Sequence, residues 1–298
     1  MSKKKNAEEW FREGYEYDAI ESLPRKAVKA YKKCIELDDN FVDAYVNLGF
    51  ISLQEENFEE AEKYFSKVIE IEPDNPEAYN NLGYVYEKME RFGTAKQMYE
   101  KALEINPRDF EAIIDIAHIA DLQGDYENAI KQYQKGIKIA PQLVHPYFCL
   151  ALLYDRHDMF DEAIEYYQKV LALDPQHVKA TFNLGNLYTQ NGNYEKALDS
   201  FKKVLELNPD NAEAWNNLGS VFEDMNNQDE AISAYRKSLA LNSFQEEANF
   251  NLSRLEYLRN QSHLDSSMKK EIVQRLKFVL SVNPKHVKAK QLLEKLEN

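Results

Sequence analysis

The chain has 298 residues and a formal net charge of −14. This acidic excess disfavours nucleic acid and anionic membrane surfaces as partners, because their phosphates would repel the chain. No apolar run approaches the roughly 20 residues that a membrane-spanning helix needs, and the N-terminal lysines lead into Asn6, Glu8 and Glu9 instead of an apolar signal core. We therefore predict a cytoplasmic protein with no nucleic-acid and no membrane partner.

The glycines and cysteines restrict the chemistry further. None of the nine glycines belongs to a GxGxxG or GxxxxGK(S/T) pattern, so no phosphate-binding loop is expected. Cys34 and Cys149 lack the spacing of metal ligands, and two such thiols suit a reducing compartment. We predict neither a cofactor nor a metal ion.

Small residues recur along the chain with a step of 34 residues. The first series is Gly49, Gly83, Ala117, Ala151, Gly185, Gly219 and Ser253. A second series is Ala27, Ala61, Ala95, Ala129, Ala163, Ala197 and Ala231. Prolines form a third series, Pro73, Pro107, Pro141, Pro175 and Pro209. Three series in phase indicate an array of repeated structural units. In such an array the number of domains cannot be inferred from the chain length.

Each unit predicts a pair of helices, as residues 76–109 illustrate. The first half has a helical apolar stripe at i, i+3, i+4 and i+7, namely Tyr79, Leu82, Gly83 and Tyr86. The second half has another, Ala95, Met98, Tyr99, Ala102, Leu103 and Ile105, and should end before Pro107, because proline disfavours helix in the preceding residue. Gly83 and Ala95 predict a close approach of the two helices. Leucine at Gly83 or Gly185 should therefore be damaging and alanine nearly silent.

In chain order, the first unit, residues 7–41, is one residue longer than its successors. We place the extra residue in the turn 21–24, where Pro24 suits the first position of the second helix. Six regular units are expected to follow, at residues 42–75, 76–109, 110–143, 144–177, 178–211 and 212–245.

The eighth unit, residues 246–286, carries a seven-residue insertion at 261–267. The insertion forms either a longer loop or an extension of the first helix, and Ser266 or Ser267 is the expected N-cap of the second helix. A helix at residues 287–298 should cap the stack with a polar outer face. The net charge from residue 261 onward is +4, against −18 for residues 1–260. This basic end is either a solvated cap or a docking site for an acidic partner.

The unit resembles the tetratricopeptide repeat (TPR) family, whose pattern W-x2-L-G-x2-Y, A-x3-F, A-x4-P is matched at Trp215, Leu218, Gly219, Phe222, Ala231 and Tyr235. Ser238 and Ser243 depart from that pattern, whereas residues 76–109 fit it throughout. The resemblance covers nearly the whole chain. It implies an all-α fold, with residues 1–298 forming one right-handed superhelical solenoid of about eight helix-turn-helix units. It also implies that the first helices line a concave groove for a partner protein or peptide.

Asparagine recurs on the side of the first helices opposite to the packing stripe. It occupies five of seven equivalent positions, Asn47, Asn81, Asn183, Asn217 and Asn251, interrupted by Asp115 and Cys149. A carboxamide can donate to and accept from the backbone of an extended peptide at once. The repeats of O-GlcNAc transferase look similar in carrying such an asparagine ladder. The alternatives are that these amides bond between adjacent helices or merely reflect a family consensus.

An apolar strip is expected beside the asparagine ladder. It comprises Phe50, Tyr84, Ile114, Phe148, Leu152, Phe182 and Phe250, with Phe148 and Phe182 exposed to a ligand. Eleven acidic residues, among them Asp121 and Asp155, are expected to face the same way, against four basic residues. A basic or mixed peptide is therefore favoured over an acidic one.

One branch of the family captures acidic chaperone tails with paired lysines, asparagines and an arginine on consecutive first helices. The corresponding pairs here include Val46 with Phe50 and Asn80 with Tyr84. This carboxylate clamp is therefore not expected in the chain.

A catalytic centre has little support in the sequence. Asp115, His118 and Asp121 share one helical face, with His145 near them, and would suit metal ligands or an acid–base group. An open, wet groove would not support such a site, so we predict that the chain is not an enzyme.

The sequence therefore favours a non-catalytic adaptor that holds a segment of a partner protein in its groove. The first alternative is a self-assembling scaffold, a homo-oligomer in which one protomer docks on another. A targeting subunit for an enzyme on another chain would show the same sequence features.

Overall fold

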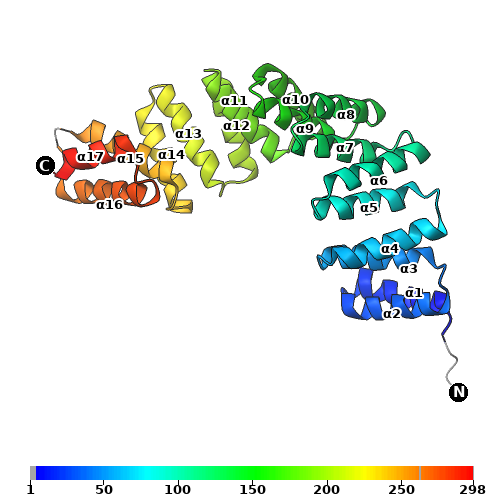
Figure 1. The fold of residues 1–298 in the computed structure, drawn as a ribbon. Coiled ribbons are helices and arrows are strands. Elements are labelled where there is room, and N and C mark those ends of the chain that lie inside the picture. Colours follow the sequence, from blue (N-terminus) through cyan, green and yellow to red (C-terminus); the bar gives the residue numbers. More distant parts are fainter. Residues whose placement is uncertain (1–4, 262, 298) are drawn as a thin grey trace. The chain divides into compact units, whose positions relative to one another are not determined.

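A computed structural model describes residues 5–261 and 263–297, and in these residues the protein is all-α (Figure 1). They form seventeen α-helices and one π-helical turn, with no strand among the described residues, which confirms the predicted fold class of paired helices. The chain divides into two compact units, Met1–Cys149 and Leu150–Asn298, and the division falls within one helix, α9. None of the described helices combines the length and apolar character that crossing a membrane requires.

The N-terminal unit is a stack of helical hairpins, in which α3, α5 and α7 also pack on the second helix of the preceding hairpin. Its elements are α1 (Ala7–Tyr15), the π-helix η1 (Glu16–Ile20), α2 (Pro24–Leu37), α3 (Val42–Gln54), α4 (Phe58–Ile71), α5 (Pro76–Lys88), α6 (Phe92–Ile105), α7 (Phe110–Leu122), α8 (Tyr126–Ile139) and the first part of α9 (Val144–Arg156). Helix α6 ends at Ile105, two residues before Pro107, as predicted.

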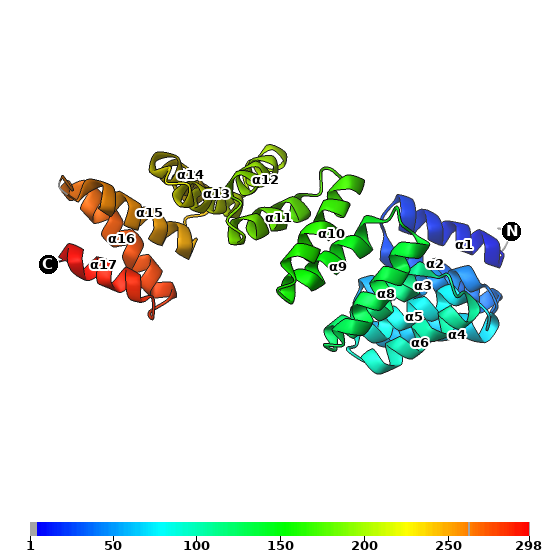
Figure 2. The same ribbon diagram turned by 90° about the horizontal axis from the view of Figure 1, so that it is seen from above.

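The C-terminal unit continues the same alternation of first and second helices. After the end of α9 it contains α10 (Phe160–Leu173), α11 (Val178–Gln190), α12 (Tyr194–Leu207), α13 (Ala212–Asp224), α14 (Gln228–Leu241), α15 (Glu246–Asn260), α16 (Ser266–Val282) and α17 (Val287–Glu297). Helix α16 packs against both α15 and α17 (Figure 2). The buried residues of α17 are Ala289, Leu292 and Leu296. The last residue of the predicted capping helix, Asn298, lies outside the described residues.

The small-residue series mark where the two helices of a hairpin touch. All seven alanines of the second series are fully buried. A Cβ atom placed on Gly83 would lie 2.7 Å from the ring of Tyr99, and one on Gly185 would lie 2.8 Å from the ring of Phe201. These distances are shorter than carbon atoms tolerate, so the ring must move even for alanine. This contact argues against the expectation that alanine would be nearly silent at these sites.

The first unit accommodates its extra residue differently from the prediction. The turn between the two helices is not lengthened; instead, the first helix continues from α1 into the π-helix η1, whose wider i→i+5 spacing takes up one residue. Pro24 begins α2, as predicted.

The seven extra residues of the eighth unit are shared among three elements. Regular units have a first helix of 13 residues and a second of 14, whereas α15 has 15 and α16 has 17. The loop between α15 and α16 takes the rest, and Ser262 in it lies outside the described residues. The predicted N-cap was wrong, because Asp265 caps α16 by accepting a hydrogen bond from the backbone N–H of Met268 at 2.8 Å.

The tight turns between paired helices place one residue in the left-handed region. Glycine occupies it at Gly124 and Gly192, but Glu90 has φ of +58° at the equivalent position. A left-handed conformation costs an L-residue with a side chain roughly 1–2 kcal/mol. We expect Glu90→Gly to raise the free energy of unfolding by about 0.5–1 kcal/mol, after the entropy cost of glycine is subtracted. Urea denaturation measures this, and Gly192→Ala, the reverse change at an equivalent turn, should be destabilising.

Candidate functional site

A cleft opens between the first helices α3, α5 and α7 of the N-terminal unit. Its volume is about 430 Å³. The side chains that line it include Val46, Phe50, Asn80, Asn81, Arg108 and Glu111. Two of these, Phe50 and Asn81, belong to the predicted site. Phe50 is 44% exposed and rests edge-on against the buried ring of Phe65, with ring centroids 5.5 Å apart. The cleft therefore offers an apolar surface and a carboxamide side by side.

The walls of this cleft are tied together by a hydrogen bond between neighbouring first helices. Asn80 of α5 donates its Nδ2–H to Oδ2 of Asp109 at 2.8 Å. Asp109 also caps α7, because its Oδ1 accepts from the backbone N–H groups of Glu111 and Ala112. One carboxylate thus fixes the start of α7 and its spacing from α5. Asp109, Glu111 and Glu77 face a single cationic residue, Arg108, so the lining of the cleft is net acidic.

Sequence reasoning placed Asn80 on the groove side of its helix without counting it among the binding residues, and it missed Arg108. A signal for Asn80 exists in the repeat, because Asn216 occupies the equivalent position four units later. Its Nδ2–H donates to Glu247 of α15 at 3.4 Å, the counterpart of the contact between Asn80 and Asp109. Arg108 follows Pro107 in a turn, and no periodic pattern distinguishes it.

The asparagine ladder is partly engaged within the protein. Asn47 donates to the hydroxyl of Tyr31 at 3.1 Å, and Asn183 donates to the hydroxyl of Tyr167 at 2.8 Å. Each tyrosine lies on the second helix of the preceding hairpin, 16 residues earlier in the chain. For these two amides, bonding between adjacent helices is therefore observed.

At two other positions of the ladder, phenylalanine replaces this tyrosine. Phe65 precedes Asn81 by 16 residues and offers no hydroxyl, and Asn81 makes no hydrogen bond to another described residue. Phe201 precedes Asn217 in the same way, and Asn217 donates instead to Asn186 at 2.8 Å. Asn251 also makes no hydrogen bond within the described part of the chain, although Tyr235 precedes it by 16 residues and its buried hydroxyl has no partner there. The half-buried amide of Asn81 therefore keeps its donors and acceptor for a ligand or water.

The members of the apolar strip differ in exposure. Tyr84 is exposed, with the ammonium group of Lys88 4.7 Å from its ring centroid, and Phe148, Leu152 and Phe182 are half-buried. Ile114 is 6% exposed, because its side chain fills the space above Gly136. The expectation that Ile114 lines the open surface is corrected on this point. Phe250 is likewise buried, with its ring centroid 4.4 Å from that of His286.

Acidic groups on the N-terminal unit form a cluster around Glu87. The hydroxyl of Tyr99 donates to Glu87 Oε2 at 3.3 Å, and Nδ1 of His118 lies 3.3 Å from Glu87 Oε1. The hydrogen bond with Glu87 raises the pKa of His118. Burial, and then repulsion by Glu87, raises the pKa of Asp115 to about 7. The negative charge of this face therefore decreases as pH falls through 7, when Asp115 takes up a proton.

The C-terminal unit has a comparable acid at Asp155. Its Oδ2 accepts from the hydroxyl of Tyr167 at 3.4 Å, and Tyr167 in turn accepts from Asn183. Burial raises the pKa of Asp155. Asp121, the other predicted acid, is half-buried on α7 of the N-terminal unit.

The described residues show no set of metal ligands. Nowhere in residues 5–261 and 263–297 do three His, Cys, Asp or Glu side chains come together in a way that would hold a metal ion. His145 lies beside Cys149 on α9, with Nε2 3.5 Å from Sγ, and burial lowers the pKa of His145.

Family models match most of the chain. Models described as tetratricopeptide repeat match residues 41–108, 74–142, 144–177, 166–199 and 212–244, and one described as TPR repeat matches 185–226. In a comparison with curated proteins, no sequence matches this chain.

Solved structures share the fold at low sequence identity. The C-terminal part of a TPR repeat-containing protein from Cytophaga hutchinsonii is 22% identical, with a TM-score of 0.68 over 82% of this chain and 98% of that one. For pilF of Pseudomonas aeruginosa the identity is 21% and the TM-score 0.61, over 73% and 98% of the two chains. For YrrB, described as a TPR protein with an unusual peptide-binding site, the values are 21% and 0.55, over 62% and 95%.

Proposed function

Because the chain belongs to the tetratricopeptide repeat family, we propose that it is a non-catalytic adaptor that binds a segment of a partner protein. The family's repeats are protein-interaction modules. The observation that carries the proposal is the cleft of about 430 Å³ between α3, α5 and α7, in which Phe50 and Asn81 lie together. YrrB, described as a TPR protein with an unusual peptide-binding site, is consistent with this proposal.

The lining of the cleft indicates how a peptide would be held. The amide of Asn81 can donate to a backbone carbonyl and accept from a backbone N–H of an extended segment. The exposed ring of Phe50, with Val46 beside it, provides an apolar contact for a side chain of that segment. Since Glu77, Asp109 and Glu111 outnumber Arg108, the cleft favours a basic or mixed peptide.

The remaining predicted residues extend the proposed contact surface within each unit. On the N-terminal unit these are Asn47, Tyr84, Phe148 and Asp121, and on the C-terminal unit they are Leu152, Asp155, Phe182, Asn183, Asn217 and Asn251. We expect Asn47 and Asn183 to contribute less to binding than Asn81, because each already donates to a tyrosine hydroxyl.

Peptides selected from a displayed library on the immobilised protein provide ligands for a direct test. We expect Asn81→Ala and Phe50→Ala each to reduce the binding free energy of such a peptide by about 1–3 kcal/mol, the range for a central contact. Calorimetry measures this change. Asn81→Ala should leave the melting temperature nearly unchanged, since its amide has no hydrogen bond to another described residue. Lys131→Ala, an exposed change on the second helix α8, is the matched control.

The outcome that removes the proposal is binding by Asn81→Ala and Phe50→Ala at wild-type strength. Light scattering over a range of concentrations tests the scaffold alternative, which requires self-association. Co-purification with an enzyme would instead support the targeting-subunit alternative.

A further inference from the structure

A second cleft lies on the outer side of the first hairpin, away from the α3–α5–α7 cleft. Its volume is about 530 Å³. Trp10 of α1 and Tyr17 of η1 form its aromatic floor, and four lysines of α2, Lys26, Lys29, Lys32 and Lys33, surround it. We call this surface the α1–α2 face.

The repeat shows what covers the equivalent surface elsewhere in the chain. Trp10 and Tyr17 correspond to Tyr79 and Tyr86 two units later, once the extra residue of the first unit is counted. There the preceding second helix, α4, packs on α5, and the hydroxyl of Tyr86 donates to Glu62 of α4 at 2.9 Å. An acidic side chain on a helix therefore meets this tyrosine inside the array.

At the α1–α2 face no described helix takes the place of α4. Helix α1 packs against α2 and η1, and the hydroxyl of Tyr17 donates to Glu13 of its own helix at 3.1 Å. Figure 1 shows α1 and α2 at the outer end of the hairpins of the N-terminal unit. The face is thus shaped to accept one more helix in the position that α4 occupies on α5.

The charge of this face decides which kind of helix fits. The lining has four lysines and one acid, Glu36. Lys33 pairs with Glu36 and Lys32 with Glu60, while Lys26 and Lys29 have no ion pair among the described residues. A second copy docking through its C-terminal end is disfavoured, since residues 261–298 carry a net charge of +4 and would be repelled.

We propose that the α1–α2 face binds an acidic amphipathic helix of a partner protein. Its apolar side packs on Trp10 and Tyr17, as α4 packs on α5 beside Tyr86. Its carboxylates meet Lys26, Lys29 and Lys33. This proposal does not depend on peptide binding in the α3–α5–α7 cleft, which uses different helices.

The probe is a peptide with the sequence Phe58–Ile71 of α4, in which Lys63→Glu and Lys67→Glu make it strongly acidic. A side-chain crosslink holds it helical, because isolated helices of this length are marginal in water. The comparison peptide keeps the apolar residues and carries lysine in place of every glutamate. Fluorescence anisotropy of the labelled peptides measures their affinity for the full chain.

We expect the acidic helix to bind the wild-type chain and the basic helix to bind at least about tenfold more weakly. The double variant Lys29→Glu, Lys33→Glu should bind the acidic helix about tenfold or more weakly than wild type, because each charge reversal replaces attraction by repulsion. Lys131→Glu with Lys135→Glu, the equivalent pair three units later on α8, is the matched control and should bind as wild type. The Asn81→Ala variant should also bind this helix as wild type does. A failure of peptide binding in the α3–α5–α7 cleft can therefore be distinguished from a failure of this proposal.

Three results would overturn the proposal. The first is equal binding of the acidic helix by wild type and by the Lys29→Glu, Lys33→Glu variant. The second is wild-type binding to anionic phosphatidylserine vesicles with no binding of the helix, which would make the face a lipid-binding surface. The third is self-association of the wild type, seen by sedimentation and lost in the variant, which would make it an interface between copies.

Discussion

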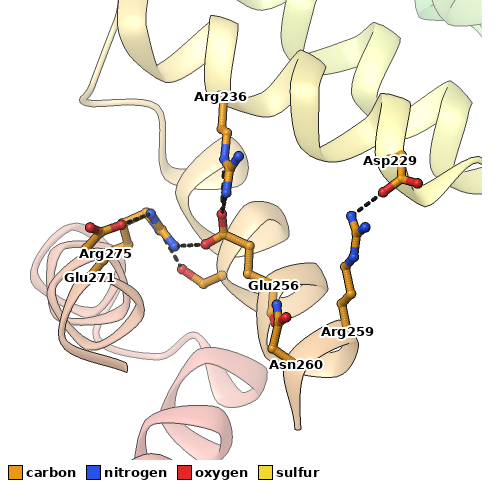
Figure 3. Close-up of polar contacts among 8 residues, drawn as sticks. Asp229, Arg236, Glu256, Arg259, Asn260, Glu271 and Arg275 are labelled. Carbon is orange, nitrogen blue, oxygen red and sulfur yellow. Dashed lines mark hydrogen bonds and ion pairs between the residues drawn. The ribbon is translucent and has the colours of Figure 1, made fainter. Parts of the chain in front are cut away.

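Replacing Glu256 by alanine is expected to lower the free energy of unfolding by about 3 kcal/mol, because it leaves a partly buried arginine without its carboxylate. Glu256 of α15 is 3% exposed. Its Oε1 accepts from Arg236 of α14, with Nε at 3.1 Å, and its Oε2 accepts from Arg275 of α16 (Figure 3). Arg275 also donates to Ser253 at 3.1 Å. One carboxylate thus joins three successive helices.

Most of this cost arises at Arg275, whose side chain is only 17% exposed. Arg236 is largely exposed and can bond to water when the carboxylate is lost. The pair Asp229 and Arg259, on the same two helices α14 and α15, is exposed and provides the control. Asp229→Ala should cost less than about 1 kcal/mol, as exposed ion pairs do.

Urea denaturation under the same conditions compares the free energies of unfolding of the two variants. If Glu256→Ala is as mild as Asp229→Ala, the network does not stabilise the C-terminal unit. The effect should persist at high salt for Glu256 and fade for Asp229, since screening acts mainly on exposed charges.

This network illustrates what the sequence could not predict. Periodicity of 34 residues predicts contacts that recur in every unit, and it correctly predicted paired helices and the buried alanine series. The contact between Glu256 and Arg275 occurs once, and it spans the insertion at 261–267. Its geometry depends on how the extra residues were divided among α15, the loop and α16, which no repeated pattern determines.

For the asparagine ladder, the sequence contained information beyond the spacing of the asparagines. The feature that distinguishes Asn47 and Asn183 from Asn81 is a tyrosine or a phenylalanine 16 residues earlier. That difference is visible in the sequence, but its meaning requires knowing that these two positions meet across adjacent helices. The α3–α5–α7 cleft is harder still, because Asn80 meets Asp109 at the far end of its unit and Arg108 lies in a turn.

The second large effect is expected at Gly83. Gly83→Leu should lower the free energy of unfolding by about 3 kcal/mol or more, because the site has no room even for a methyl group. A Cβ there would lie 2.7 Å from Cε1 of Tyr99, which is fully buried beneath it. Leucine would force the ring and the two helices apart. Gly185→Leu should behave in the same way, since Phe201 occupies the equivalent position.

Gly83→Ala should be intermediate. Alanine already occupies the equivalent positions Ala117 and Ala151, so a hairpin can be built around a methyl group when the ring is placed for it. In the hairpin of α5 and α6 the ring of Tyr99 must shift, at a cost of about 1–2 kcal/mol. Gly93→Ala in α6 is the control, because a Cβ there has no neighbour within 4 Å and alanine favours helix. In chemical denaturation the free energy of unfolding should therefore decrease from Gly93→Ala to wild type, then to Gly83→Ala, and then to Gly83→Leu. A Gly83→Leu variant as stable as wild type would show that these two helices are not in close contact.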